Sequence, residues 1–143
     1  MAGLIRGQLE HLKPILECWV APSGIGEGHF PRGMKVRALI DTGATHIVLR
    51  QMHVDALGLQ ANGSVVSTNV GAIITSESYS VDLIFEGVNT SPDHILHRFT
   101  VTGAMATVSE FHQDFDIILG MHVLQHLGLH FDRSGNFKVD LPG

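Results

Sequence analysis

The sequence predicts a mainly-β domain, a closed barrel or folded sheet with one or two short helices. Short apolar runs are separated by Gly, Pro and Asn turns, and helical spacing occurs in only two short segments. Strands and helices do not alternate as they would around a parallel sheet. The 143 residues fit one domain, which we place at residues 14–143 after an N-terminal extension at residues 1–13.

The composition limits the kinds of partner. The chain is 44% hydrophobic and 16% charged, so either the core is large or a partner covers apolar surface. The net charge is −5, and the nine Lys and Arg residues do not cluster, which argues against nucleic-acid binding. The single cysteine, Cys18, excludes an internal disulfide and a cysteine-based zinc site.

No apolar run has the length of a membrane helix, and residues 1–10 lack the apolar core of a signal peptide. We therefore expect no membrane partner and a cytoplasmic location.

The first part of the chain is predicted to hold three strands and one helix. A loop at residues 21–33, rich in Gly and Pro, separates the first two strands, and Gly58 is a stop signal for the helix. The predicted elements are strands at Pro14–Val20, Met34–Ile40 and Ile47–Leu49 and a helix within Gln51–Leu59.

The middle of the chain predicts a hairpin and two longer strands. Asn69–Gly71 forms a turn signal between two β-rich runs, and residues 89–93 form a loop. Gly103–Gln113 gives no clear signal. The predicted strands are Val65–Thr68, Ala72–Thr75, Tyr79–Phe85 and His97–Thr102.

The last part predicts a buried strand, a helix and a second hairpin. Phe115–Leu119 is nearly all apolar, as in a strand buried on both faces. Met121–Leu127 has helical spacing, and Gly128 is a candidate stop. Leu129–Phe131 and Phe137–Val139 flank a turn at residues 132–136.

The most informative feature is the phrase Asp41-Thr42-Gly43-Ala44, which directly follows an apolar strand. Such a strand delivers one carboxylate to a tight turn, where Gly43 lets backbone N–H groups approach it. Because the phrase occurs once, a mechanism that needs two carboxylates needs two copies of the chain. An ordinary capping carboxylate is the simpler alternative.

These features together resemble the retropepsin-like aspartic proteases, in particular bacterial and retroelement-like members. Four pieces over residues 14–140 occur in the family's order: the strand and turn Leu39–Ala44, the hairpin near Thr68–Ile73, the segment Ile117–Gly120, and a short helix from Met121. The resemblance implies a homodimeric aspartic endopeptidase that acts on peptides and needs no cofactor or metal.

The resemblance also assigns roles to residues. Asp41, Thr42 and Gly43 would form the catalytic turn, with Thr42 hydrogen-bonded across the dimer axis. The substrate-binding positions would be Ala44 and the hairpin residues Asn69, Val70, Gly71 and Ala72. Ile118, Leu119 and Gly120 would support the turn structurally. The hairpin departs from the retroviral pattern, since Gly71 is its one glycine and its tip carries no aromatic residue.

Two other functions remain open. A non-catalytic dimerisation or peptide-binding module could keep the same fold, and the unusual hairpin favours it. A histidine metal site is suggested by His122, His126 and His130 at intervals of four, but Gly128 should end the helix before His130. We favour surface or interface histidines and expect no metal.

Overall fold

The computed structural model describes residues 3–23, 33–69, 71–88, 94–107 and 114–142. Six of the described strands close into a barrel in the order β2-β3-β8-β4-β7-β6, with β6 pairing back onto β2. The mainly-β barrel prediction is therefore confirmed. The barrel strands are β2 (Ile15–Pro22), β3 (Met34–Ile40), β4 (Val48–Arg50), β6 (Ala72–Val88), β7 (His94–Thr107) and β8 (Ile117–Leu119).

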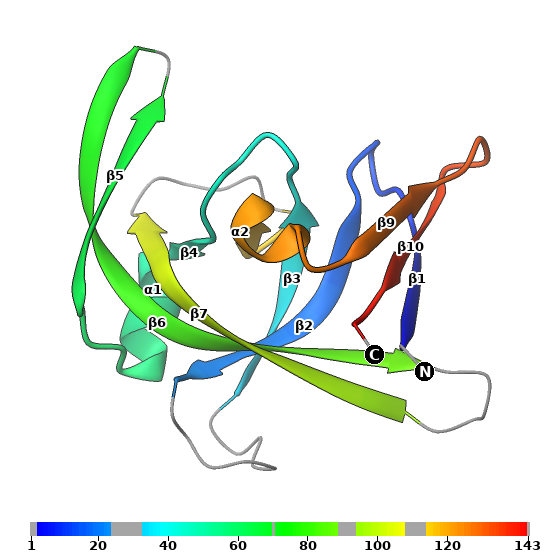
Figure 1. Ribbon diagram of the computed structural model, residues 1–143, viewed down its shortest axis with the longest axis horizontal. Helices are drawn as coiled ribbons and strands as arrows, with labels where there is room; N and C mark the ends of the chain where they lie inside the picture. The colour runs from blue at the N-terminus through cyan, green and yellow to red at the C-terminus, as the bar shows by residue number, and fades with distance from the viewer. Residues whose placement is uncertain (1–2, 24–32, 70, 89–93, 108–113, 143) are drawn as a thin grey trace.

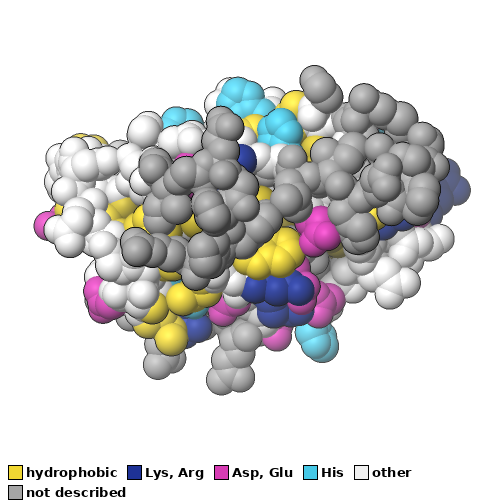
Figure 2. All heavy atoms as spheres, turned by 90° about the horizontal axis from the view of Figure 1, so that it is seen from below, with side chains coloured by type: hydrophobic (Ala, Val, Ile, Leu, Met, Phe, Trp, Pro, Cys, Tyr) yellow, Lys and Arg dark blue, Asp and Glu magenta, His cyan; other side chains and the backbone are white. Residues whose placement is uncertain are grey.

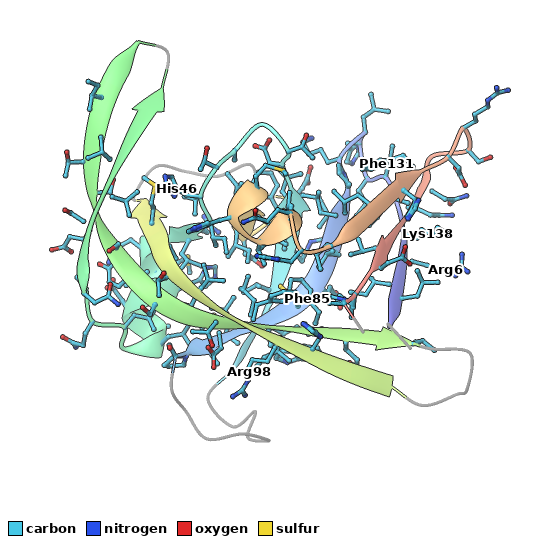
Figure 3. All side chains as sticks on the ribbon, viewed as in Figure 1. Arg6, His46, Phe85, Arg98, Phe131 and Lys138 are labelled. Carbon is cyan, nitrogen blue, oxygen red and sulfur yellow. The ribbon has the colours of Figure 1, made fainter. Side chains whose placement is uncertain are left out.

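The barrel core is built by the alternating side chains of its strands. On β6, Val81, Leu83 and Phe85 are fully buried and point inward. Phe85 lies in the middle of the molecule in Figure 3, with its ring edge-on to Phe99 at 5.7 Å. Cys18 on β2 is also fully buried, and burial raises the pKa of its thiol to about 12, so it behaves as a core residue.

A ribbon of three strands lies beside the barrel and contains both chain ends. It consists of β1 (Leu4–Gln8), β10 (Asn136–Asp140) and β9 (Gly128–Phe131), paired antiparallel in that order. Strand β1, within the segment expected to precede the domain, also pairs with β6 at Leu4 and Val88. The two termini consequently lie side by side in Figure 1, and Arg6, Phe131 and Lys138 lie along this ribbon in Figure 3.

The predicted hairpin extends from the barrel as β5 (Gly63–Asn69) paired with the first half of β6. Asn69 pairs with Ala72 at its tip, and Gly71 has a φ of 83°, a conformation that favours glycine. Strand β6 continues past the hairpin into the barrel wall, with a register shift opposite β7 between Tyr79 and Val81. Figure 1 shows the hairpin standing apart from the barrel.

Two short helices lie between strands. Helix α1 (Gln51–Leu57) ends, as predicted, at Gly58, whose φ of 64° forms a left-handed cap. Helix α2 (Met121–Leu124) is shorter than the predicted Met121–Leu127. The amide N–H groups of His126 and Leu127 bond to carbonyls three residues back, as in a tighter turn. The prediction of Gly128 as a helix stop was wrong, because Gly128 begins β9.

The other predictions hold with shifted boundaries. Strand β7 includes residues 103–107, where the sequence gave no clear signal, and β8 begins at Ile117 rather than Phe115. The loop predicted at residues 89–93 lies outside the described residues, as do Val70 and most of the loop at residues 21–33. On the face seen in Figure 2, the central Lys and Arg side chains lie beside Asp and Glu side chains.

Candidate active site

The candidate site is centred on Asp41, which directly follows β3. The Asp41 N–H donates to the Leu119 carbonyl on β8 at 3.0 Å, so the residue is held by the neighbouring parallel strand. The Gly43 N–H donates to Asp41 Oδ1 at 2.9 Å, and the Ala44 N–H donates to the Asp41 carbonyl at 3.1 Å. These bonds fix the carboxylate through the backbone. Within the described part of the chain, Oδ2 has no hydrogen-bond partner.

The turn is open to solvent at the end of the barrel. Asp41 and Ala44 are partly exposed, while Thr42 and Gly43 are exposed. A Cβ atom at Gly43 would lie 3.3 Å from Asp41 Oδ1, so the absence of a side chain there leaves room for the carboxylate. The four residues therefore present one oriented carboxylate oxygen on the outside of this chain.

The predicted structural residues lie beneath this turn. Leu119 is fully buried and pairs with Ile40, and Ile118 pairs with Leu39 on one side and Val48 on the other. Strand β8 thus runs between β3 and β4, parallel to the first and antiparallel to the second. Strand β8 is therefore the middle one of these three strands, and it supports the end of β3 from one side.

Helix α2 is attached to the other end of the turn. The Met121 N–H donates to the Ala44 carbonyl at 2.8 Å, and the His122 N–H donates to the Thr45 carbonyl at 2.9 Å. The loop passes so close to Gly120 that a Cβ atom there would lie 2.3 Å from the His46 carbonyl oxygen. Gly120 has an extended backbone, so this close approach, rather than an unusual φ, requires glycine.

The predicted hairpin positions belong to a different part of the fold from the Asp41–Ala44 turn. Asn69, Gly71 and Ala72 lie at the tip of the β5–β6 hairpin, which leaves the barrel wall, and Val70 lies outside the described residues. The structure therefore brings together Asp41 to Ala44 with Ile118 to Gly120. It does not join the hairpin tip to them by a described hydrogen bond.

A pair of histidines beside the turn is a feature that sequence reasoning only partly anticipated. His46 packs edge-on against His122 of α2, with ring centroids 6.0 Å apart. Its Nδ1 is buried without a hydrogen-bond partner in the described part of the chain. His122 was considered as a metal-ligand candidate, but two histidines so far apart in the sequence as His46 and His122 give no local signal of contact.

The sequence analysis missed the polar network around Arg37 on β3. The Arg37 N–H donates to Asp116 Oδ2 at 2.9 Å, and the Asp116 N–H donates to the Arg37 carbonyl at 2.7 Å. The guanidinium Nη2 donates to both carboxylate oxygens of Glu10, at 2.8 and 2.9 Å, and this contact raises the pKa of Arg37. The charged Arg37 between the apolar residues Val36 and Ala38 was the available signal.

The described residues show no group of three His, Cys, Asp or Glu side chains that could hold a metal ion. Three of the surface hollows lined by described residues have volumes of about 380, 200 and 270 Å³, and Asp41 lines none of these three. Among the same residues, no helix is both long enough and apolar enough to cross a membrane.

The barrel has the fold of the retropepsin-like aspartic proteases. The family model described as "gag-polyprotein putative aspartyl protease" matches residues 32–126, and the chain belongs to this family. A comparison with curated protein sequences finds no match.

Three solved structures align with this chain. A retropepsin-like aspartic protease from Rickettsia conorii aligns over 99% of this chain and 92% of its own, with a TM-score of 0.64 and 14% identity. EIAV protease in complex with the inhibitor HBY-793 aligns over 79% and 86%, with a TM-score of 0.41 and 21% identity. The retroviral protease-like domain of Ddi1 from Leishmania major aligns over 84% and 82%, with a TM-score of 0.36 and 15% identity. The first of these supports the fold assignment.

Proposed function

We propose that this protein is an aspartic endopeptidase that acts as a homodimer, with one Asp41 from each subunit. The observation that carries the proposal is the Asp41 carboxylate, oriented by the Gly43 N–H and exposed at the end of the barrel. Cytoplasmic location is a further part of the proposal, which cell fractionation would test.

The proposed chemistry follows from two carboxylates at contact distance. Like charges so close cannot both ionise, so the pair holds one shared proton. The ionised Asp41 takes a proton from water, while the protonated Asp41 donates a hydrogen bond to the peptide carbonyl. The exposed hydroxyl of Thr42 is available to hydrogen-bond across the axis and lock the two turns. Any measured pKa then belongs to the pair.

The proposed substrate is an extended peptide bound as a strand between the subunits. Strand β5 pairs with β6 and with no other described strand, so one edge of the hairpin has backbone groups available. Main-chain pairing of this kind holds peptides in many sheet-edge complexes. In the dimer, Ala44 and the hairpin positions Asn69 to Ala72 would then contact the peptide.

The decisive experiment compares the wild type with Asp41→Asn on a mixed peptide library from acid to neutral pH. We expect the wild type to cleave and the variant to lose activity by at least about 100-fold, because general acid–base catalysis contributes about 10²–10⁴. Asn has nearly the same shape, so circular dichroism and Tm should stay close to wild type. Activity retained in the folded variant would refute the proposal.

A non-catalytic peptide-binding or dimerisation module is the second candidate. The β5–β6 hairpin favours this non-catalytic candidate, because Gly71 is the one glycine between Gly63 and Ser78. Closure of such a hairpin over a substrate is the least supported step of the protease proposal. If neither protein cleaves any peptide although a dimer is present in solution, the library should be tested for binding instead.

A further inference from the structure

One edge of strand β7 is largely without a strand partner. On its first edge β7 pairs with β6 along residues 94–105, but on its second edge β4 pairs only with residues 105–107. No other described strand pairs with this second edge. Backbone N–H and carbonyl groups before residue 105 are therefore left out of the sheet there, and such a free edge is a template for an additional strand.

A hollow of about 200 Å³ lies along this free edge. Four consecutive residues of β7 line one side of the hollow: Phe99, Thr100, Val101 and Thr102. Successive side chains of a strand point to opposite faces, so four neighbours line one hollow together only along the edge of the strand. Because their first edge is occupied by β6, the hollow borders the free one.

Helix α2 and the turn that follows it form the opposite wall. The residues on this side of the hollow are His122, Val123, Gln125 and His126. At the end of the hollow, a Cβ atom on Gly103 would lie 3.9 Å from His122 Cε1, and Figure 1 shows α2 beside β7. We call this hollow, lined by residues 99–102, 122, 123, 125 and 126, the β7–α2 groove. A groove between a sheet edge and a helix suits an extended peptide, because main-chain pairing on one side is combined with side-chain contacts on the other.

The two histidines of the groove offer free hydrogen-bond donors. Both are exposed, and neither imidazole forms a hydrogen bond or an ion pair with the described residues. The ring of His122 lies edge-on to His46 at 6.0 Å, and the ring of His126 stacks on Phe99 at 6.1 Å. An imidazole carries at least one N–H in each protonation state, so both rings are oriented donors.

The other polar groups of the groove favour an acidic ligand. No Asp, Glu, Lys or Arg is among the lining residues. Gln125 Nε2 donates to the His122 carbonyl at 3.1 Å, and Thr100 Oγ1 donates to Asp82 Oδ1 at 2.8 Å. Asp82 is 2% exposed and lies 3.5 Å from the Arg98 guanidinium, which compensates its charge. The imidazole donors therefore remain for a ligand, and the acceptor that N–H donors bind most strongly is an ionised carboxylate.

We propose that the β7–α2 groove binds an extended acidic segment of another protein. The segment adds to the free edge of β7 as a further strand and places an Asp or Glu carboxylate against His122 and His126. The groove is smaller than the pockets of about 300–1,000 Å³ that hold small molecules, which fits a short stretch of chain. Asp41 does not line the groove, so the inference holds whether or not Asp41 is catalytic.

Strand β9 provides an internal comparison. Among the described strands it pairs only with β10, so it also has a free edge. The hollow at the outer ribbon is lined by acid and base together, including Asp132, Arg6 and Lys138, and by no helix residue. The combination of a free edge, a helical wall and unpaired imidazoles thus distinguishes β7.

Selection of peptides tests the proposed ligand class. A phage library of random octapeptides is selected in parallel on the Asp41→Asn protein, which keeps the bait from cleaving its ligand, and on the same protein with His122→Phe and His126→Phe. Phe keeps a ring of similar shape but removes the donors. We expect the peptides enriched only on the parent to carry Asp or Glu. Absence of any such peptide, or parent-specific peptides without an acid, would overturn the proposal.

His130→Phe is the matched control for this selection. His130 is also exposed but lies on β9, so this variant should enrich the same peptides as the parent. Circular dichroism and Tm establish that each variant is folded. Equal loss of the peptides in this control would place their site elsewhere and contradict the proposal.

A charge reversal tests the contact with the carboxylate. His126→Glu should weaken binding of a selected acidic peptide at least about tenfold, as measured by fluorescence anisotropy. The analogue of that peptide with Lys in place of its acid should bind this variant better than the parent. Equal weakening of both peptides would show that the acid does not contact the histidine.

Strand addition has its own signature in solution. In spectra of the ¹⁵N-labelled protein, the selected peptide should shift amide signals of residues 97–104 and 121–126 and leave those of residues 128–131 unchanged. N-methylation along the peptide should weaken binding only at alternate positions, because neighbouring N–H groups of a strand point to opposite sides. Shifts centred on the β5–β6 hairpin or on β9, or equal effects at every methylated position, would refute strand addition to β7.

Discussion

Gly120 shows how a single missing side chain shapes the candidate site. The loop that follows Asp41 crosses directly over it, with the Thr45 carbonyl carbon 2.7 Å and the His46 oxygen 2.3 Å from the position of a Cβ atom. These are backbone atoms, which cannot rotate away as the end of a side chain can. Carbonyl groups of this loop also accept hydrogen bonds from the N–H groups of the two residues that follow Gly120. Gly120 therefore controls how closely the turn packs against α2.

We predict that Gly120→Ala destabilises the protein by about 1–3 kcal/mol, the usual cost of overpacking, and lowers peptide cleavage at least tenfold. The new methyl group must push the Asp41–Ala44 turn, the proposed catalytic site, away from α2. The measurement is urea unfolding together with the cleavage assay.

Gly135→Ala is the control for that substitution. Gly135 has a φ of 79° but nothing within 4 Å of its Cβ position, so alanine costs only about 1–2 kcal/mol of backbone strain there. The control should keep its activity. Equal loss of activity in both variants would show that general destabilisation, and not the seating of the turn, is responsible.

For single residues, the sequence predicts those features that depend on neighbouring positions in the chain. Asp41, Gly43 and Gly120 could be identified because each belongs to a short phrase beside an apolar strand. The contact of His46 with His122 could not, because it depends on β8 being placed next to β3 by the rest of the chain.

Among the elements, helix α1 carries a pH-sensitive residue into the interior. His53 is 9% exposed, and its Nδ1 has no hydrogen-bond partner in the described part of the chain. Burial lowers the pKa of His53, nearby Arg50 lowers it further, and Asp116 partly opposes this. The folded protein therefore takes up this proton less readily than the unfolded chain does.

We predict that His53 makes the fold less stable in acid. The unfolded histidine binds its proton below about pH 6.5, so the free energy of unfolding falls as the pH drops through that value toward the lower folded pKa. His53→Leu should remove this loss, and its Tm relative to wild type should rise between pH 7.5 and 5. Differential scanning calorimetry measures this, where about 2–4 °C corresponds to 1 kcal/mol.

His126→Leu provides the control for the acid series. His126 is exposed, so this variant removes a histidine without changing the buried imidazole of α1, and the loss of Tm in acid should persist in it. A wild type that loses no more stability in acid than His53→Leu would contradict the prediction.

The length of helix α2 differs from the length that its apolar spacing predicts. The apolar spacing of Met121, Leu124 and Leu127 predicts a two-turn helix, but only the first turn is α-helical. The chain then enters β9, where a Cβ atom at Gly128 would lie 3.1 Å from the Asp140 carboxylate. Gly128 therefore permits close strand packing rather than ending a helix, and that requirement comes from the distant strand β10.

For the whole molecule, the proposed dimer makes activity depend on concentration. Half a site cannot catalyse, so specific activity should fall on dilution below the dissociation constant. The adjacent termini in the outer ribbon suggest a further test, in which two copies are joined end to end by a flexible Gly/Ser linker.

We predict that the joined protein keeps its specific activity at dilutions where the separate chains have lost theirs. Placing Asp41→Asn in only one half should abolish cleavage of the diluted protein, because both carboxylates are required. The readout is the initial rate per site over a dilution series. Full activity with one intact Asp41 would mean that a single chain is sufficient.

The bond from the Asp41 N–H to the Leu119 carbonyl also has a consequence for synthesis. A ribosome makes about 5–20 residues per second, so Asp41 emerges several seconds before the strand that seats it. The nascent chain therefore cannot seat the Asp41 turn while most of β6, β7 and β8 is still untranslated. If Asp41 is catalytic as proposed, a chain still being translated before Leu119 cannot cleave its neighbours, since its own site forms only after β8 has been made.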